Sequence, residues 1–336
     1  MKNRYLLLAF VFPFIFAACS KDTFIAEPEV NPPAAYVSDS SFKIVGYFPS
    51  YRDPAGVDPS KYKMVTHLFY AFLNPRADGS LAPLSQPGRF NTVIQQAKAR
   101  GVKTGISVSG DAAIFVSMAA SATTRTAFVK NALAFVRSNE LDGLDMDWEY
   151  PRQNVSDETY ALLMKELSDS LHKHNKFLSA AITPGVYAGT VRDGIRTEVF
   201  SYADFFNIMI YDGAGWQGEL NHASYNMTVA SLNYWLNTRG MPRKKAVLGM
   251  PAYGKTAGGT AATVREFEAA GIDITGDYAR YNNTDYYFNG SITIKQKTAL
   301  ASQRCNGIMF WEIYQDTNSA GSIIKAANDQ LGRNYN

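Results

Sequence analysis

Short apolar runs, rich in β-branched and aromatic residues, alternate along the chain with longer segments that repeat apolar residues every three to four positions. The runs begin near Ile44, Val65, Lys103, Asp142, Leu178, Phe205, Ala246 and Asn306. In the longer segments the repeat places apolar side chains on one face of a helix. Two such faces are clear: Phe128, Ala132, Phe135 and Val136, and then Tyr160, Leu163, Met164, Leu167 and Leu171. The pattern therefore predicts strands that alternate with helices.

Strands that alternate with helices eight times favour a closed (β/α)8 barrel, the TIM-barrel fold, in a single domain. The strand runs are apolar on both faces, as strands buried between a barrel interior and a layer of helices must be. An open, doubly wound parallel sheet would show the same alternation, so the pattern leaves that fold as the alternative.

The first residues have the features of a targeting segment. Lys2 and Arg4 precede an apolar run over residues 5–16 that is too short to span a bilayer comfortably, and small residues lead up to Cys19. This order resembles a bacterial lipoprotein signal, which predicts that residues 1–18 are removed and that Cys19 carries acyl chains. An ordinary cleaved signal peptide is the alternative. We expect export and lipid anchoring to the cell envelope, at the outer membrane.

The remainder of the chain divides into a linker and one domain. Residues 19–41 are rich in Pro, Ala, Ser and acidic residues, and we expect them to link the lipid to a domain spanning residues 42–336. Cys305 is the only other cysteine, so an acylated Cys19 leaves no intramolecular disulfide. The net charge is +3 and no basic stretch carries interleaved aromatic residues, which gives no electrostatic reason to expect nucleic acid as a partner. We expect a monomer.

Acidic residues alternate with apolar ones along residues 141–151. Because side chains on a strand alternate faces, Asp145, Asp147 and Glu149 point to one side and the apolar residues between them point to the other. Carboxyl groups roughly 7 Å apart at the backbone raise at least one pKa and keep a proton among them at neutral pH. Glu149 lies nearest the carboxyl end of the strand, where barrel enzymes hold their reacting groups. The pattern predicts a carboxylic acid at Glu149 that can donate a proton.

Two other interpretations of these acids stay open. A solvated edge strand would explain them without chemistry, although Met146 and Trp148 need a dry side. A divalent cation site would use the same carboxylates as oxygen ligands. His172 and His174 do not support a metal, because residues two apart on a helix face apart. We expect neither a metal nor another cofactor, so activity should survive EDTA.

The segment from Asp142 to Glu149 has the form DxxDxDxE, the signature of family 18 glycoside hydrolases, the chitinase family. Five further segments resemble barrel strands of that family: Ile44–Phe48, His67–Phe72, Met209–Asp212, Gly249–Gly254 and Gly307–Glu312. The resemblance runs from about Lys43 to the end of the chain. It implies a TIM barrel and a retaining mechanism in which the substrate's own 2-acetamido oxygen attacks the anomeric carbon.

The same resemblance implies a role for each catalytic residue. Glu149 would protonate the leaving oxygen and then deprotonate the incoming water. Asp147 would orient the acetamido N–H and stabilise the oxazolinium cation, with Asp145 beneath it as a charge and hydrogen-bond partner, and Tyr211 would donate its hydroxyl to the acetamido oxygen. The expected substrate-binding residues are Tyr47, Phe72, Ser107, Met209, Asp212, Tyr253 and Trp311. Of these, Phe72, Met209 and Trp311 would equally suit a barrel core.

The chain departs from the family pattern at the third strand. The family usually shows Ser-x-Gly-Gly followed by an aromatic residue, whereas this chain has Ser109 at the first glycine position and Asp111 in place of a sugar-stacking aromatic. The leaving-group subsite is therefore undefined, and Trp216 would either supply a platform or simply pack in its loop. The stretch from Lys255 to Arg304 is too short for both a helix and a large α+β insertion, so we expect an open, shallow groove.

These features lead us to expect an endo-acting, retaining hydrolase of β-1,4-linked N-acetylglucosamine glycans, that is, chitin or chitooligosaccharides. An endo-β-N-acetylglucosaminidase that cleaves N-glycan cores would use the same chemistry. A non-catalytic surface glycan-binding protein on the same barrel is the third candidate, but such relatives usually lack the acid that Glu149 supplies.

Overall fold

The structure, a computed structural model, describes residues 35–335 of the chain. The predicted signal peptide (residues 1–18), the acylation site Cys19 and the linker as far as residue 34 lie outside the described residues. Export, lipid anchoring and envelope location therefore stay predictions. Within the described range, no single helix is long and apolar enough to cross a bilayer, and only one pair of helices, bent by 112°, meets that criterion jointly.

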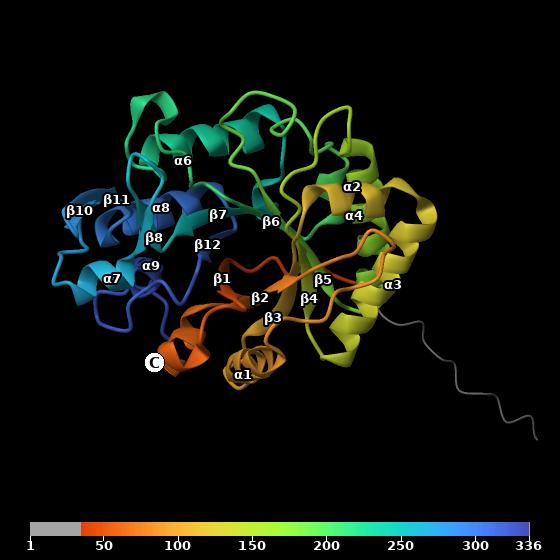
Figure 1. Ribbon diagram of the computed structural model, residues 1–336, viewed down its shortest axis with the longest axis horizontal. Coiled ribbons are helices and arrows are strands. Elements are labelled where there is room, and N and C mark those ends of the chain that lie inside the picture. The colour runs from red at the N-terminus through yellow and green to blue at the C-terminus, as the bar shows by residue number, and fades with distance from the viewer. Residues whose placement is uncertain (1–34, 336) are drawn as a thin grey trace, which may run out of the picture. The chain divides into compact units, whose positions relative to one another are not determined.

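Eight parallel strands close into a barrel in the order β1-β12-β7-β6-β5-β4-β3-β2, which confirms the predicted (β/α)8 fold (Figure 1). The strands are β1 (Lys43–Pro49), β2 (His67–Leu73), β3 (Lys103–Val108), β4 (Gly143–Met146), β5 (Phe177–Ile182), β6 (Phe205–Ile208), β7 (Ala246–Pro251) and β12 (Gly307–Trp311). Each begins within two residues of its predicted position. The apolar runs in the sequence therefore located every strand of the barrel.

Helices cover the outside of the barrel (Figure 1). They are α1 (Pro87–Lys98), α2 (Ala112–Ala120), α3 (Ala122–Ser138), α4 (Asp157–His172), α5 (Val199–Tyr202), α6 (Tyr225–Leu232), α8 (Ser291–Arg304) and α9 (Ile323–Gln330). A π-helical turn, Asn233–Thr238, continues α6. The predicted apolar faces of α3 and α4 are buried in the core, with Phe135 only partly buried, which confirms the helical periodicity seen in the sequence.

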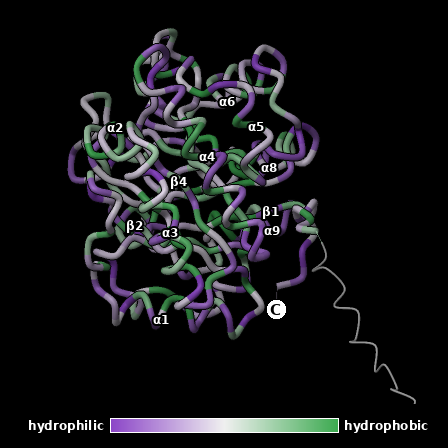
Figure 2. The backbone as a smooth tube through the Cα atoms, turned by 90° about the vertical axis from the view of Figure 1, so that its right-hand side faces the viewer, coloured by the Kyte–Doolittle hydropathy of each residue, from purple (hydrophilic) through white to green (hydrophobic). Residues whose placement is uncertain are grey.

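Side chains along each barrel strand alternate between two apolar cores. On β1, Ile44 and Phe48 belong to the core between strands and helices, whereas Val45 and Tyr47 belong to a smaller core inside the barrel. Hydrophobic stretches run through the interior, and many of the outer turns are hydrophilic (Figure 2). Cys305 is buried, as its apolar sequence context indicates. Because of this alternation, every second residue at the carboxyl end of a strand faces the mouth of the barrel.

A small α+β insertion follows β7 and consists of a helix and an antiparallel sheet in the order β10-β11-β8-β9. Its elements are β8 (Tyr253–Lys255), β9 (Ala261–Thr263), α7 (Val264–Ala269), β10 (Tyr278–Tyr281) and β11 (Thr284–Tyr287). Thr263 and Glu266 cap the first turn of α7 reciprocally. The prediction that no large insertion is present holds. The small one was not anticipated, because strands of three or four residues carry too short a pattern to recognise.

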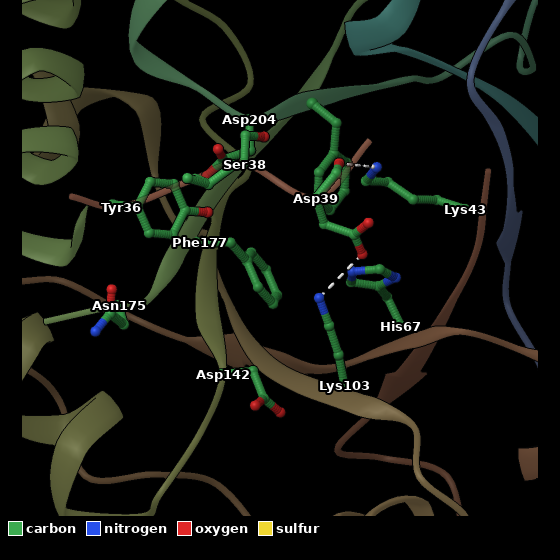
Figure 3. Close-up of a pocket in the computed structure, with 12 residues that line it drawn as sticks. Tyr36, Ser38, Asp39, Lys43, His67, Lys103, Asp142, Asn175, Phe177 and Asp204 are labelled. Atoms are coloured by element: carbon green, nitrogen blue, oxygen red, sulfur yellow. Dashed lines mark hydrogen bonds and ion pairs between the residues drawn. The ribbon is translucent and has the colours of Figure 1, made fainter. Parts of the chain in front are cut away.

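Residues 36–41, which we call the bottom segment, pack against the amino ends of the barrel strands (Figure 3). The ring of Tyr36 stacks on His172 with centroids 4.1 Å apart. Asp39 forms an ion pair with Lys103, with 3.0 Å between the charged atoms. The segment and the strand ends together line a cavity of about 230 Å³. The last residues assigned to the linker thus contact the barrel.

Replacing Tyr36 by alanine should lower the free energy of unfolding by about 1 kcal/mol, because the ring loses its stack on His172. Val37→Ala is the matched control, since Val37 lies in the same segment and is 84% exposed. Urea unfolding of both variants measures the difference. Equal stability of the two variants would show that the Tyr36 ring does not hold the bottom segment to the barrel.

Candidate active site

Asp145, on β4, is the centre of a buried hydrogen-bond network. Its Oδ2 accepts hydrogen bonds from the Tyr47 hydroxyl at 2.8 Å and from Ser107 Oγ at 2.8 Å. Its Oδ1 accepts from Ser179 Oγ at 2.6 Å and from Asn207 Nδ2 at 3.2 Å. The donors come from β1, β3, β5 and β6, whose inward-facing residues meet at this level of the barrel. Burial raises the pKa of Asp145, and the four donors counter that rise by stabilising the carboxylate.

Asp147 follows Asp145 one step nearer the mouth of the barrel. It is 4% exposed, and its Oδ1 has no hydrogen-bond partner among the described residues. Burial raises the pKa of Asp147 well above its usual range, and the negative charges of Glu149 and Asp145 raise it further. Asp145 has four donors, whereas Oδ1 of Asp147 has none, so the Asp147 carboxylate is the less stabilised of the two.

Glu149 opens onto the pocket at the mouth of the barrel. Although its side chain reaches solvent, the surrounding protein excludes enough water to raise the pKa of Glu149; a hydrogen bond from Tyr150 lowers that pKa and the charge of Asp212 raises it. The net shift is upward, so Glu149 keeps its proton to a higher pH than a free glutamic acid does. Burial raises the pKa of Tyr211 well above its usual range, so its hydroxyl stays a hydrogen-bond donor.

The pocket has a volume of about 220 Å³ and lies at the carboxyl ends of the strands. Eight of the predicted site residues line it: Phe72, Asp147, Glu149, Met209, Tyr211, Asp212, Tyr253 and Trp311. Tyr47, Ser107 and Asp145 are buried below and bond to one another through the Asp145 carboxylate. The site is therefore a pocket above a buried polar layer. Tyr253, at the start of the small insertion, forms one wall of this pocket, and the expected open, shallow groove stays a prediction.

Trp311 ends β12 and forms an aromatic wall of the pocket. Its ring stacks on Phe72, with centroids 5.7 Å apart and planes 15° apart, and lies 5.5 Å from the ring of Tyr47. The next residue, Glu312, is fully buried and accepts a hydrogen bond from Arg52 Nε at 2.8 Å. That ion pair fixes the backbone next to the ring. The wall offers the flat apolar surface on which a sugar ring stacks.

Asp212 has a left-handed backbone conformation (φ 63°), which Asp tolerates better than most residues. Its Oδ1 accepts a hydrogen bond from the Tyr253 hydroxyl at 2.6 Å and pairs with Lys255 Nζ at 2.6 Å. Its backbone N–H donates to His222 Nδ1 at 3.1 Å. Burial would raise the pKa of Asp212, but contacts with His222, Lys255 and Tyr253 lower it. Asp212 is therefore a fixed carboxylate that faces the same pocket as Glu149.

Known sequences resemble this chain over most of the barrel. The profile of glycosyl hydrolases family 18 matches residues 43–316, which is more than half of the chain. The chain belongs to glycosyl hydrolases family 18. It is 28% identical over 286 residues to Endochitinase 1 of Metarhizium robertsii, and the alignment covers 69% of this chain and 66%, just under two thirds, of that relative.

Solved family 18 structures share the fold. The chitinase ChiB from the chitin utilization locus of Flavobacterium johnsoniae has a TM-score of 0.73 and 27% identity, covering 86% of this chain and 94% of its own. A Cycas revoluta chitinase solved in complex with (GlcNAc)3 has a TM-score of 0.75 and 23% identity, covering 86% of this chain and 100% of its own. The second likeness shows the fold alone.

The pocket and the polar layer below it contain residues that the sequence did not single out. Ser179 and Asn207 donate to Asp145 from inward positions of otherwise apolar strands, a signal that was available in the sequence. Tyr150 lines the pocket directly after the acid, and Pro184 lines it just after β5. That Tyr150 and Pro184 line one pocket could not be predicted from the sequence, because it depends on the closed barrel, in which the ends of β4 and β5 lie at the same mouth.

The two residues considered as leaving-side features lie elsewhere. Asp111 caps α2, where its carboxylate accepts the backbone N–H of Ala113 at 2.8 Å. Trp216 is partly buried against the outer core and does not line the pocket, in keeping with a packing role. Over residues 35–335, no group of three or more His, Cys, Asp or Glu side chains is arranged to hold a metal ion. Trp216, the one platform considered from the sequence, is therefore not part of the pocket wall.

Proposed function

We propose that the protein is an endo-acting, retaining hydrolase of β-1,4-linked N-acetylglucosamine chains such as chitin and chitooligosaccharides. The observation that carries the proposal is the buried Asp147, whose Oδ1 lacks a hydrogen-bond partner among the described residues while Glu149 opens onto the same pocket. A buried polar atom without a partner is costly, and an acetamido N–H is the donor that would satisfy it. Membership of family 18 supports the same chemistry.

Cleavage would take two steps. In the first, Glu149 gives its proton to the glycosidic oxygen, the bond from that oxygen to the anomeric carbon breaks, and the acetamido oxygen bonds to the same carbon. Asp147 stabilises the resulting oxazolinium cation, and Tyr211 donates its hydroxyl to the acetamido oxygen. In the second step Glu149 takes a proton from water, which attacks the anomeric carbon and reopens the oxazolinium ring with retention of configuration. Trp311 supports the reacting sugar throughout.

Mass spectrometry of the products tests this function. We expect chitohexaose to be cut at internal bonds and a high-mannose glycoprotein to keep its glycans. Release of the N-glycan with chitohexaose intact would favour the endo-β-N-acetylglucosaminidase activity, and binding of chitohexaose without products would favour a glycan-binding protein. Equally fast cleavage of glucose oligomers, which lack the acetamido group, would contradict the substrate-assisted mechanism.

The pH dependence of hydrolysis follows from the raised pKa of Glu149. Because the protonated form donates, kcat/KM should persist above the usual range of a glutamic acid and fall as the pH rises through that raised pKa. Asp212→Asn removes a negative charge that favours the proton on Glu149, so the alkaline limb should move to lower pH. Asp169→Asn, at a side chain 65% exposed on α4, should leave the limb in place. An unmoved limb in Asp212→Asn would show that Asp212 does not control the protonation of Glu149.

A further inference from the structure

Lys297, on α8, is fully buried and does not line the active-site pocket. Its Nζ donates hydrogen bonds to the backbone carbonyl oxygen of Ala223 at 2.5 Å and to Asn289 Oδ1 at 2.7 Å. No carboxylate in the described part of the chain forms an ion pair with it. Burial lowers the pKa of Lys297 to about 7, although the charges of Asp277 and Glu219 raise it. A buried amine is costly, so these two hydrogen bonds are what offset its burial.

The contacts of Lys297 belong to a closed set, which we call the clamp: the Lys297 ammonium, the Asn289 amide and the Ala223 carbonyl. Asn289 is also fully buried, and its Nδ2 donates to the same carbonyl oxygen at 2.9 Å. The other end of this short segment is held as well, because Asn221 Nδ2 donates to the carbonyl oxygen of Phe288 at 2.7 Å. The clamp therefore fixes residues 221–223 against α8 and the end of the small insertion.

His222 lies in the middle of the segment that the clamp holds, and it is fully buried. Its Nδ1 accepts the backbone N–H of Asp212 at 3.1 Å, and its carbonyl oxygen accepts the backbone N–H of Gly213 at 2.8 Å. Its other ring nitrogen lies 3.2 Å from the carbonyl oxygen of Tyr253. The clamp thus reaches the backbone of Asp212 through a single intervening residue.

Asp212 is the pocket residue whose position depends on this contact. Its left-handed backbone and its bonds to Tyr253 and Lys255 place the carboxylate so that it faces the pocket that Glu149 lines. The charge of Asp212 raises the pKa of Glu149, and the size of that effect depends on the distance between the two carboxyl groups. A shift of the Asp212 backbone would therefore change the protonation of the acid.

We propose that Lys297 is a positioning residue for the reaction: it holds the Ala223 carbonyl, so that His222 stays in place and keeps Asp212 facing the pocket. This role rests on the proposed function. Lys297 itself touches neither the pocket nor the Asp212 side chain, so it acts only through the segment between them.

Lys297→Met tests the proposal, because methionine fills much of the same space and donates no hydrogen bond. We expect kcat/KM for chitohexaose to fall about 10-fold to 100-fold, the usual cost of misplacing a group in an active site. The alkaline limb of the pH profile should move to lower pH, as it should in Asp212→Asn, because the charge of Asp212 no longer holds its place near Glu149. A loss of stability alone would leave that limb where it is in the folded protein.

A double-mutant cycle separates positioning from a general structural effect. Added to Asp212→Asn, Lys297→Met should change kcat/KM by no more than about twofold, since the charge that it positions is already gone. Asn289→Leu removes the second donor of the clamp and should act in the same direction as Lys297→Met, but less. Thr298→Val is the matched control: Thr298 is the next residue of α8, is fully buried, and its hydroxyl has no partner in the described part of the chain. It should leave kcat/KM and the limb unchanged.

Titration of the carboxyl groups by ¹³C NMR gives a readout that needs no turnover, and the signal missing from Asp212→Asn identifies Asp212. The pKa of Asp212 is held below its usual range partly by His222, so in Lys297→Met it should rise towards that range. An equal Asp212 pKa in Lys297→Met and the unmodified protein, or an equal loss of kcat/KM in both backgrounds, would overturn the proposal and leave the proposed function standing. If the unmodified protein did not cleave chitohexaose, the proposed function would fall and the role of Lys297 in the reaction with it, whatever the titration showed.

Discussion

Glu149→Gln should reduce the hydrolysis of chitooligosaccharides by about 100-fold to 10⁴-fold, the usual contribution of a general acid. Glutamine keeps the size of the side chain but cannot give a proton to the glycosidic oxygen. Stability should stay near that of the unmodified protein, because Glu149 opens onto the pocket and belongs to neither apolar core. The Trp311 wall and the other residues that line the pocket remain, so chitohexaose should still bind.

Initial rates on chitohexaose and calorimetric titration with the same sugar measure the two effects separately. Glu158→Gln is the matched control, because it makes the same chemical change at a side chain that is 70% exposed on α4. It should keep full activity. Turnover by Glu149→Gln at the rate of the control would remove Glu149 from the reaction.

Asp316→Ala should lower the free energy of unfolding by about 3–5 kcal/mol. Lys61 Nζ lies 3.0 Å from Asp316 Oδ2, and the two side chains are 2% and 0% exposed. Without the carboxylate, the buried Lys61 ammonium loses the partner it pairs with, which costs more than the intact pair contributes. The same carboxylate accepts the backbone N–H of Ile323 at 2.9 Å, in the first turn of α9, and that contact is lost as well.

Urea unfolding checks this expectation against an exposed pair. Asp329→Ala breaks the pair with Lys325, which is closer, at 2.6 Å, but whose side chains are 41% and 36% exposed. The loss there should be about 0–1 kcal/mol, because water screens the exposed charges. Adding Lys61→Met to Asp316→Ala should recover part of the larger loss, since it removes the stranded charge. Similar stabilities of Asp316→Ala and Asp329→Ala would contradict the argument.

In the acidic strand, the local alternation of side chains correctly predicted which residues face the pocket and which face the outer core. Alternation of faces placed Trp148 on the opposite side from the acids, and it is buried against Phe115, with ring centroids 5.1 Å apart, in the outer core. The ladder of β4 ends at Met146, yet the alternation continues through Asp147 and Glu149 to the pocket. The prediction of opposite sides was confirmed beyond the last paired residue, because Asp147 and Glu149 line the pocket while Trp148 lies in the outer core.

The residues that contact Asp212 could not be predicted from local sequence pattern. His222 lies in the loop before α6, and Lys255 lies in a three-residue strand of the insertion. Neither position has a periodicity or a turn signal that points to Asp212. Their contacts exist because the chain returns to the mouth of the barrel after β6 and again after β7.

The sequence by itself determined the eight strands, the faces of the main helices and the three acids, because side-chain alternation and helical periodicity are properties of a few neighbouring residues. Only the tertiary structure decided which four donors surround Asp145 and how His222 and Lys255 hold Asp212. The Tyr47 hydroxyl and the Asp145 carboxylate are 98 positions apart in the chain and 2.8 Å apart in space. Hydrogen bonds and pKa shifts depend on such distances, and closure of the barrel sets them.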